Sequence, residues 1–469
     1  MAVIGAVALS VVAVSRGEAV NALWIVVAAV SCFLVAYRYY ALFIASKVMR
    51  LDPSRPTPAL RRADGLDYVA TDRTVLFGHH FAAIAGAGPL VGPVLAAQMG
   101  YLPGTLWIIV GVVLAGAVQD FMILFVSMRR DGKSLGELIR MEMGQWAGTI
   151  ALFGAFMIMV IILAVLALIV VKALAESPWG MFTVAATVPL AMMMGAYTRW
   201  IRPGRIGEVS LLGLVGLLAA IVYGQSVAAS PFWGPIFTFT PLTLCWILIG
   251  YGAVASILPV WLLLAPRDYL STFLKIGAIA ALAVGIVIMA PPLKMPALTQ
   301  FVEGGGPVWS GGLFPFLFIT IACGAVSGFH ALISSGTTPK LIASEGHAPM
   351  IGYGAMLMEA FVAIMALVGA SILDPGIYFT MNSPAALIGT DAASASAAVT
   401  AMGFPISPDL ITQTAKDVGE HSIISRAGGA PTLAVAMAEI FSHVVGGPAM
   451  KAFWYHFAIL FEALFILTA

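Results

Sequence analysis

The chain has 469 residues, of which 61% are hydrophobic and only 10% are charged, whereas a soluble domain carries about 25% charged residues. The 23 Lys and Arg nearly balance the 22 Asp and Glu, so the charge indicates no nucleic-acid partner. Many apolar runs reach the roughly 20 residues that a membrane span needs. The composition therefore predicts an all-α integral membrane protein with many spans.

About thirteen membrane helices are expected, separated by short charged hinges. The first is short, as a signal peptide would be, but no Lys or Arg precedes it, and it is interpreted as a helix. The predicted spans are 2–15, 22–45, 75–98, 104–128, 148–174, 180–197, 207–228, 241–264, 271–291, 313–337, 351–373, 429–447 and 450–469.

Lys and Arg alternate between successive hinges. Residues 46–74 contain six and 99–103 none, and residues 129–147 contain four and 175–179 none. Because cytoplasmic loops are enriched in Lys and Arg, the rich hinges are predicted to be cytoplasmic, and the span beginning at residue 75 runs outward. The polar stretch 374–428 then lies outside, where it forms either a cap over the substrate path or a passive linker.

Two irregular stretches of the chain resemble each other. "GHHFAAIAGAGP" occupies residues 78–89 and "GFHALISSGTTP" residues 328–339. The coinciding pairs are Gly78/Gly328, His80/His330, Gly86/Gly336 and Pro89/Pro339. The number of spans between them places the second copy upside down relative to the first. An inverted pair of Gly- and Pro-interrupted segments indicates a secondary transporter built from inverted repeats.

Both copies are poor helix sequences. An interior Gly costs about 1 kcal/mol relative to Ala, and a Pro about 3 kcal/mol. In lipid, broken backbone is tolerated where it is buried in protein or lines a cavity, and the start of a half-helix suits a carboxylate. The alternative is that these small residues only permit close helix contact. The predicted substrate-binding residues are Gly86, Gly88, Pro89, Gly92, Ser334, Ser335, Gly336, Thr337 and Thr338.

Ionisable residues inside a membrane are costly and are candidates for function. Those predicted to couple transport to protons are His79, His80, His330, Asp120 and Glu359. The repeat-related His80 and His330 could approach each other across a pseudo-twofold axis, and a histidine can carry a proton near neutral pH. Asp120 and Glu359 each lie in the span after one copy, and the alternative is that each forms a pair for packing only.

No metal or cofactor is predicted. A metal between His80 and His330 is a weaker alternative, because no Cys, Asp or Glu lies beside them at ligand spacing. The three cysteines, Cys32, Cys245 and Cys323, are interpreted as packing thiols. Lys275 is placed near a helix end, where its side chain can extend to the membrane surface.

Several long stretches resemble the carbon starvation protein A (CstA) family of bacterial inner-membrane transporters. They include "GHHFAAIAGAGPLVGPVLAAQMGYLPGTLW", "LPVWLLLAPRDYLSTFLKIG", "FPFLFITIACGAVSGFHALISSGTTPK" and "AFWYHFAILFEALFILTA". The resemblance runs from about Tyr37 to Ala469. It implies a LeuT-like fold with a five-plus-five inverted repeat, and uptake of peptides or proton-driven import of pyruvate. Because family chains typically run further, a truncated C-terminus is expected.

The expected organisation has four parts: N-terminal helices and a cytoplasmic hinge (1–74), an inverted-repeat core (75–373), an extracytoplasmic loop (374–428) and C-terminal helices (429–469). The expected function is import of small carboxylate-bearing nutrients, peptides or pyruvate, with a proton favoured over sodium as the coupling ion. A sensor that binds without transport and a channel are the alternatives. An enzyme is not expected, because no HExxH-type motif or nucleophile–base pair occurs.

Overall fold

The computed structural model describes residues 15, 17, 20–175, 177–259 and 261–467. This part of the chain contains helices and two isolated bridges but no strand. Eight helices are long and apolar enough to cross a membrane, or nine if one bent pair is counted as a span. The prediction of an all-helical membrane protein with many spans is therefore confirmed.

The expected number of thirteen spans is not confirmed, and the difference has three sources. Of the first expected span, 2–15, all residues but the last lie outside the described residues. Two expected spans form apolar helices shorter than eighteen residues, α13 (Pro241–Ile257) and α24 (Ala430–Val444). The expected span 313–337 is divided into several short helices.

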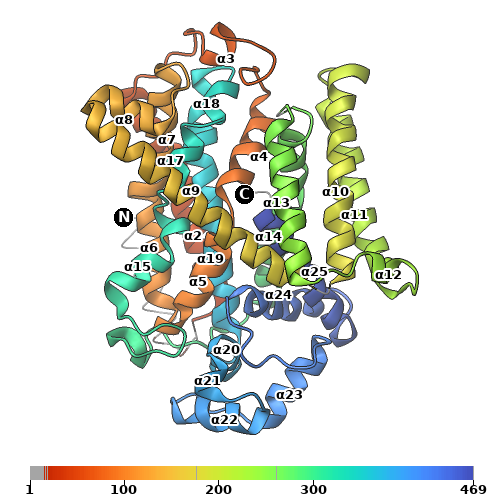
Figure 1. Cartoon of the computed structure of the whole chain (residues 1–469). Coiled ribbons are helices and arrows are strands. Elements are labelled where there is room, and N and C mark those ends of the chain that lie inside the picture. Colours follow the sequence, from red (N-terminus) through yellow and green to blue (C-terminus); the bar gives the residue numbers. More distant parts are fainter. Residues whose placement is uncertain (1–14, 16, 18–19, 176, 260, 468–469) are drawn as a thin grey trace.

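The remaining membrane helices follow the chain order of the prediction (Figure 1). They are α2 (Ala22–Val35), α6 (Tyr101–Gly111), α7 (Ala117–Arg129), α9 (Gln145–Leu174), α10 (Pro178–Ala196), α11 (Ile206–Ala229), α14 (Leu264–Met289), α19 (Ala355–Ile372) and α25 (Lys451–Leu467). A π-helical turn joins α6 to α7 in one span, Tyr101–Arg129.

Helix α19 forms the centre of the molecule. Almost all of its side chains are buried, including Glu359, and it packs against α2, α4 (Arg73–Ile84), α5 (Gly88–Ala96), α6 and α24. By contrast, α9 exposes apolar side chains such as Ile161 and Leu163 along most of its length. A helix that is apolar on all sides and buried on all sides can hold an ionisable residue only if neighbouring helices supply its partners.

The first copy of the repeated stretch is a broken helix. α4 (Arg73–Ile84) and α5 (Gly88–Ala96) are separated at Ala85–Ala87 and bent by 46°. The segment that contains the second copy is divided into α15 (Phe318–Thr320), α16 (Ala322–Ala325), α17 (His330–Ser334) and α18 (Thr338–Leu341), of which α17 and α18 fall on the copy itself. The ends of α4 and α17 are separated by 250 residues, and so are the starts of α5 and α18.

The two broken segments run in opposite directions and touch along their length. In Figure 1 the chain descends from α4 to α5 and ascends from α15 through α17 to α18. A Cβ atom at Gly88 would lie 2.2 Å from the Cβ of Cys323, and one at Gly92 would lie 2.3 Å from the carbonyl oxygen of Thr320. Both glycines are therefore required for the close approach of the two backbones.

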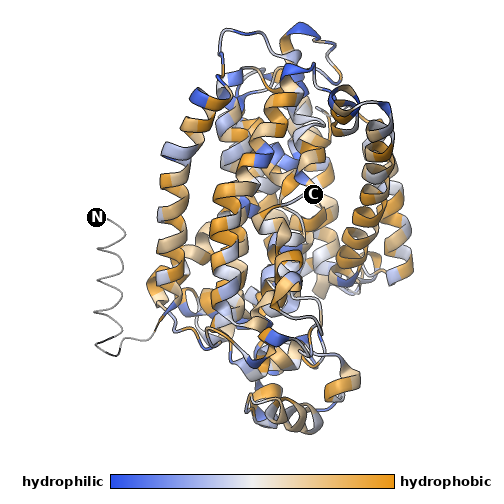
Figure 2. Ribbon diagram, turned by 90° about the vertical axis from the view of Figure 1, so that its left-hand side faces the viewer, coloured by the Kyte–Doolittle hydropathy of each residue, from blue (hydrophilic) through white to orange (hydrophobic). Residues whose placement is uncertain are grey.

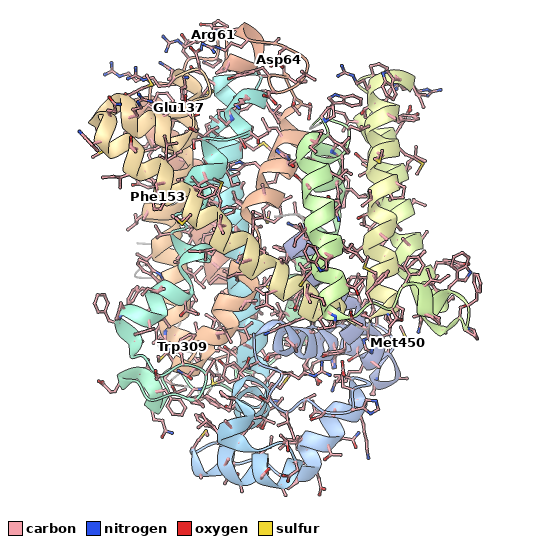
Figure 3. All side chains as sticks on the ribbon, in the orientation of Figure 1. Arg61, Asp64, Glu137, Phe153, Trp309 and Met450 are labelled. Carbon is pink, nitrogen blue, oxygen red and sulfur yellow. The ribbon has the colours of Figure 1, made fainter. Side chains whose placement is uncertain are left out.

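The hinges rich in Lys and Arg lie at one end of the molecule, as expected from their alternation. Arg61 and Arg62 of the first rich hinge contact Asp131 of the second, at 2.7 and 3.0 Å. Figure 3 shows Arg61, Asp64 and Glu137 near this end and Trp309 toward the opposite one. In Figure 2 hydrophobic residues cover the helices between the two ends.

Residues 374–428 form a folded helical region at the opposite end from α3 (Pro58–Arg61) in Figure 1. Its helices are α20 (Pro375–Asn382), α21 (Ala385–Ile388), α22 (Ala392–Ala401) and α23 (Pro408–Asp417). Asp391 and Ser407 cap the starts of α22 and α23. Val399 and Ile411 are buried on these two helices, which pack together, and both belong to the same continuous hydrophobic core as the membrane helices.

Gly92→Ala tests the backbone contact between the broken segments. The added methyl group meets a backbone carbonyl that cannot move aside, so we expect a loss of about 1–3 kcal/mol of stability. Thermal unfolding of the purified protein in detergent measures the effect. Gly154→Ala on α9 is the control, because nothing lies within 4 Å of its Cβ position, and it should be neutral or slightly stabilising. Equal stability of the two variants would contradict the contact.

Candidate functional site

One buried histidine connects three helices. His330 is the first residue of α17, and its Nδ1 lies 2.9 Å from Oδ2 of Asp120 on α7. Its Nε2 lies 2.9 Å from Oε2 of Glu359 on α19. All three side chains are at most 1% exposed. The imidazole ring therefore bridges two carboxylates that are far apart in the sequence.

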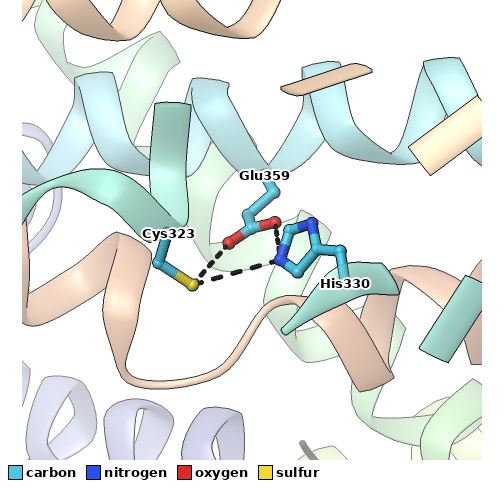
Figure 4. A group of neighbouring side chains, drawn as sticks. All are labelled: Cys323, His330 and Glu359. Carbon is cyan, nitrogen blue, oxygen red and sulfur yellow. Dashed lines mark hydrogen bonds and ion pairs between the residues drawn. The ribbon is translucent and has the colours of Figure 1, made fainter. Parts of the chain in front are cut away.

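Cys323 on α16 completes this group, which we call the His330 cluster (Asp120, Cys323, His330 and Glu359). Its thiol donates to Oε1 of Glu359 at 3.3 Å and lies 4.0 Å from Nε2 of His330. Figure 4 shows the three side chains converging from α16, α17 and α19. The interpretation of Cys323 as a packing thiol did not predict these polar contacts.

The His330 cluster has an imbalance of charge. With both carboxylates ionised and the ring protonated, it carries a net charge of −1 in a region that excludes water, where an uncompensated charge is costly. One additional proton on a carboxylate makes the cluster neutral. The cluster is therefore chemically able to take up and release a proton.

The same donors also have the spacing of a metal site. The ligand atoms of Cys323, His330 and Glu359 all lie within 4.8 Å of one another, and thiolate, imidazole and carboxylate are all zinc ligands. In the structure, however, the three groups contact each other directly at 2.9 and 3.3 Å, so they satisfy one another without an ion.

The other two predicted histidines lie on α4 and bind different partners. Nδ1 of His80 lies 2.8 Å from the hydroxyl of Thr338, at the start of α18, and Nδ1 of His79 lies 2.8 Å from Oδ2 of Asp268 on α14. No hydrogen bond or ion pair within the described residues joins His80 to His330. The Nε2 atom of His80 is buried without a hydrogen-bond partner.

The predicted substrate-binding residues lie at the breaks and around them. Gly86 lies in the first break, and Ser335, Gly336 and Thr337 form the second. The others are on the flanking helices: Gly88, Pro89 and Gly92 on α5, Ser334 at the end of α17 and Thr338 at the start of α18. The hydroxyl of Ser334 is buried without a partner, whereas that of Ser335 donates to the carbonyl of Ala331.

A cavity of about 760 Å³ lies beside α5, at Val91. It is lined by apolar side chains, by the charged Lys172, Glu420, Arg426 and Glu462, and by polar residues that include His421 and His456. None of the nine predicted substrate-binding residues lines this cavity. The structure packs Gly88 and Gly92 of α5 against α15 and α16, whereas Thr338 of α18 contacts His80 of α4, and these contacts lie beside the cavity rather than around it.

Lys275 is the residue that the sequence analysis placed wrongly. It is 1% exposed, and its ammonium group donates to the carbonyls of Ala82 and Ala85 at 2.9 and 3.0 Å. The expectation that its side chain extends to the membrane surface is wrong, because α14 begins at Leu264 rather than near residue 271. Lys275 therefore lies about three turns inside the helix.

A membrane protein whose broken helices meet at buried ionisable residues has the architecture of many secondary transporters. Residues 21–469 match the family described as carbon starvation protein CstA. The chain belongs to this family, and the resemblance noted in the sequence is confirmed.

Individual relatives are similar over the whole chain. The chain is 65% identical to the pyruvate/proton symporter BtsT of Escherichia coli (strain K12) over 491 residues, which cover 100% of the chain and 68% of that protein. It is 69% identical to the peptide transporter CstA of the same strain, and this match also covers 100% of the chain and 68% of that protein. It is 44% identical to the peptide transporter CstA of Bacillus subtilis (strain 168), covering 96% of the chain and 72% of that protein. No solved structure matches the chain.

His330→Leu tests the charge balance of the His330 cluster. The change leaves Asp120 and Glu359 buried beside an apolar side chain, so we expect a loss of about 3–5 kcal/mol. Removing both carboxyl charges as well, with Asp120→Asn and Glu359→Gln, should restore part of this loss. Thermal unfolding compares the variants, and His443→Leu, at an exposed histidine of α24, is the control. A single variant at least as stable as the triple variant would contradict the ion-pair arrangement.

Proposed function

We propose that this protein is a proton-coupled secondary transporter that imports small carboxylate-bearing nutrients, peptides or pyruvate, across the bacterial inner membrane. The observation that carries the proposal is the position of His330 between Asp120 and Glu359, where the two broken segments meet. The names of the relatives, a pyruvate/proton symporter and peptide transporters, support both the substrate class and the coupling ion.

In this proposal the substrate carboxylate binds between the two breaks. α5 begins at Gly88 and α18 at Thr338, neither with a side-chain cap on its first amides, and the positive end of a helix favours an anion. The unpartnered hydroxyl of Ser334 is a further donor. Because the segments are in close contact at Gly88 and Gly92, the substrate enters only when the half-helices separate at the breaks. The structure then corresponds to a closed state of this site.

Proton coupling follows from the composition of the His330 cluster. A proton that binds to a carboxylate removes the net charge of the cluster and changes the attraction between α17, α7 and α19. His79 and His80 pass protons between the cytoplasmic end of α4 and this region. Proton binding and substrate binding are linked because both change the contact between the two broken segments. Each ligand then changes the affinity for the other by the same factor.

An inverted repeat of the LeuT type is the arrangement we propose for the core. Its supports are the helix ends separated by 250 residues and the opposite directions of the two broken segments. The proposal retains thirteen spans, with residues 374–428 on the extracytoplasmic side. This region would then cover the outer end of the substrate path.

Uptake into proteoliposomes tests the function. We expect labelled pyruvate or a labelled dipeptide to accumulate when the outside is acidified from about pH 8 to pH 6, because protons then flow inward with the substrate. A protonophore should abolish accumulation, and replacing sodium by choline should not. Equilibration without accumulation would indicate a channel, and binding without flux would indicate a receptor.

Glu359→Gln tests the coupling site. The amide has the shape of the carboxyl group but cannot bind the transported proton, so we expect proton-driven accumulation to fall at least tenfold while substrate exchange across the membrane persists. Glu142→Gln, at an exposed residue of the hinge, is the matched control. Accumulation at the wild-type level would contradict the role of Glu359. Metal analysis of the same preparations distinguishes a proton site from a metal site, because stoichiometric zinc in the wild type alone would replace the proton mechanism.

A further inference from the structure

The ammonium group of Lys275 lies at the end of the first half-helix. Its two acceptors are the carbonyl of Ala82, in the last turn of α4, and that of Ala85, the residue that ends the helix. The last carbonyls of a helix have no amide partners within it and carry the negative end of the helix dipole. Because the chain breaks here, these carbonyls require a donor or a cation from another helix.

No carboxylate neutralises Lys275 directly. Asp268 on the same helix contacts His79, and Glu359 on α19 contacts His330 and Cys323. Within the described residues, neither acid forms an ion pair with Lys275. Lys275 also faces the ring of Phe465, whose centroid is 4.4 Å from Nζ. Backbone carbonyls and an aromatic face therefore hold the charge.

Unwound carbonyls and half-helix C-termini are the groups that coordinate the coupling cation in transporters with discontinuous helices. A sodium ion bound in this place would compete with Lys275 for the same oxygen atoms. The side chain instead places a covalently attached ammonium group at these oxygen atoms, where it does not exchange with ions from solution.

We propose that Lys275 is a tethered cation that occupies the coupling-ion position at the first break and makes the transporter independent of sodium. Lys275 is thus a specificity-determining residue for the coupling ion and a positioning residue for the end of α4. The assignment of this position to a coupling ion rests on the proposed transport function, whereas the cation dependence of stability does not.

The test is the thermal stability of purified Lys275→Ala in sodium chloride and in choline chloride at equal ionic strength. We expect the wild type to unfold at the same temperature in both salts. The variant should unfold at least about 5 °C lower in choline, and sodium should restore part of this shift, because the vacated space and the two carbonyls then accept a small cation. The same variant should show sodium-dependent uptake in proteoliposomes.

Thr272→Val is the matched control. Thr272 lies one turn before Lys275 on α14, and its hydroxyl donates to the carbonyl of Gly78 on α4 at 2.9 Å. The substitution removes a hydrogen bond between the same two helices but no charge. It should lower the unfolding temperature equally in the two salts, as a purely structural contact would.

Two results would overturn the proposal. One is a folded Lys275→Ala variant whose stability and uptake are the same in sodium and choline. The other is a wild-type protein whose unfolding temperature or uptake depends on sodium, and this measurement applies even if the variant does not fold. If the wild type transports no tested substrate but the sodium response of Lys275→Ala is present, the proposed transport function fails and the tethered cation is retained.

Discussion

A membrane interior supplies no water to satisfy a broken helix, and this constraint governs the structure around the two breaks. Each interrupted turn leaves carbonyls and amides that only other parts of the protein can satisfy. At the first break Lys275 binds the carbonyls of Ala82 and Ala85, and close by, His80 of α4 contacts Thr338 of α18. Ionisable and polar side chains gather here because the breaks require partners, and their presence gives the same region its capacity to bind ions.

The ammonium group of Lys275 offsets the excess negative charge of the His330 cluster without forming an ion pair with it. The His330 cluster combines two carboxylates with one imidazole, which leaves an excess of negative charge. Lys275, on the neighbouring α14, adds an ammonium group that forms no ion pair with a carboxylate within the described residues. Together they are neutral when the ring is protonated and both carboxylates are ionised. The gain or loss of one proton at the His330 cluster therefore changes the summed charge of the cluster and Lys275, which lie on helices that both pack against α4.

The sequence predicted an interruption in each copy because Gly and Pro weaken a helix wherever they occur. The position of the first interruption differs from that pattern, since the helix is interrupted at Ala85–Ala87 and α5 includes Pro89, Gly92 and Pro93. The partners of His330 could not be predicted in this way, because 210 residues separate it from Asp120, and tertiary packing alone brings them together. Lys275 was misplaced for a different reason. The sequence 264–270 contains Pro266, Arg267 and Asp268, which suggested a helix boundary, yet α14 includes all three.

The orientation of the two half-helices explains why the anionic and cationic groups lie where they do. α4 presents its negative end at Ala85, where Lys275 binds, and α5 presents its positive end at Gly88, which packs directly against Cys323 of the anionic cluster. Both charge distributions are stabilised by the helix dipoles. A proton that neutralises the cluster removes its attraction to the start of α5 but leaves Lys275 bound to the end of α4. In the proposed mechanism, α5 is therefore the half-helix whose attachment weakens on protonation, and it is the element through which a proton acts on the proposed substrate site.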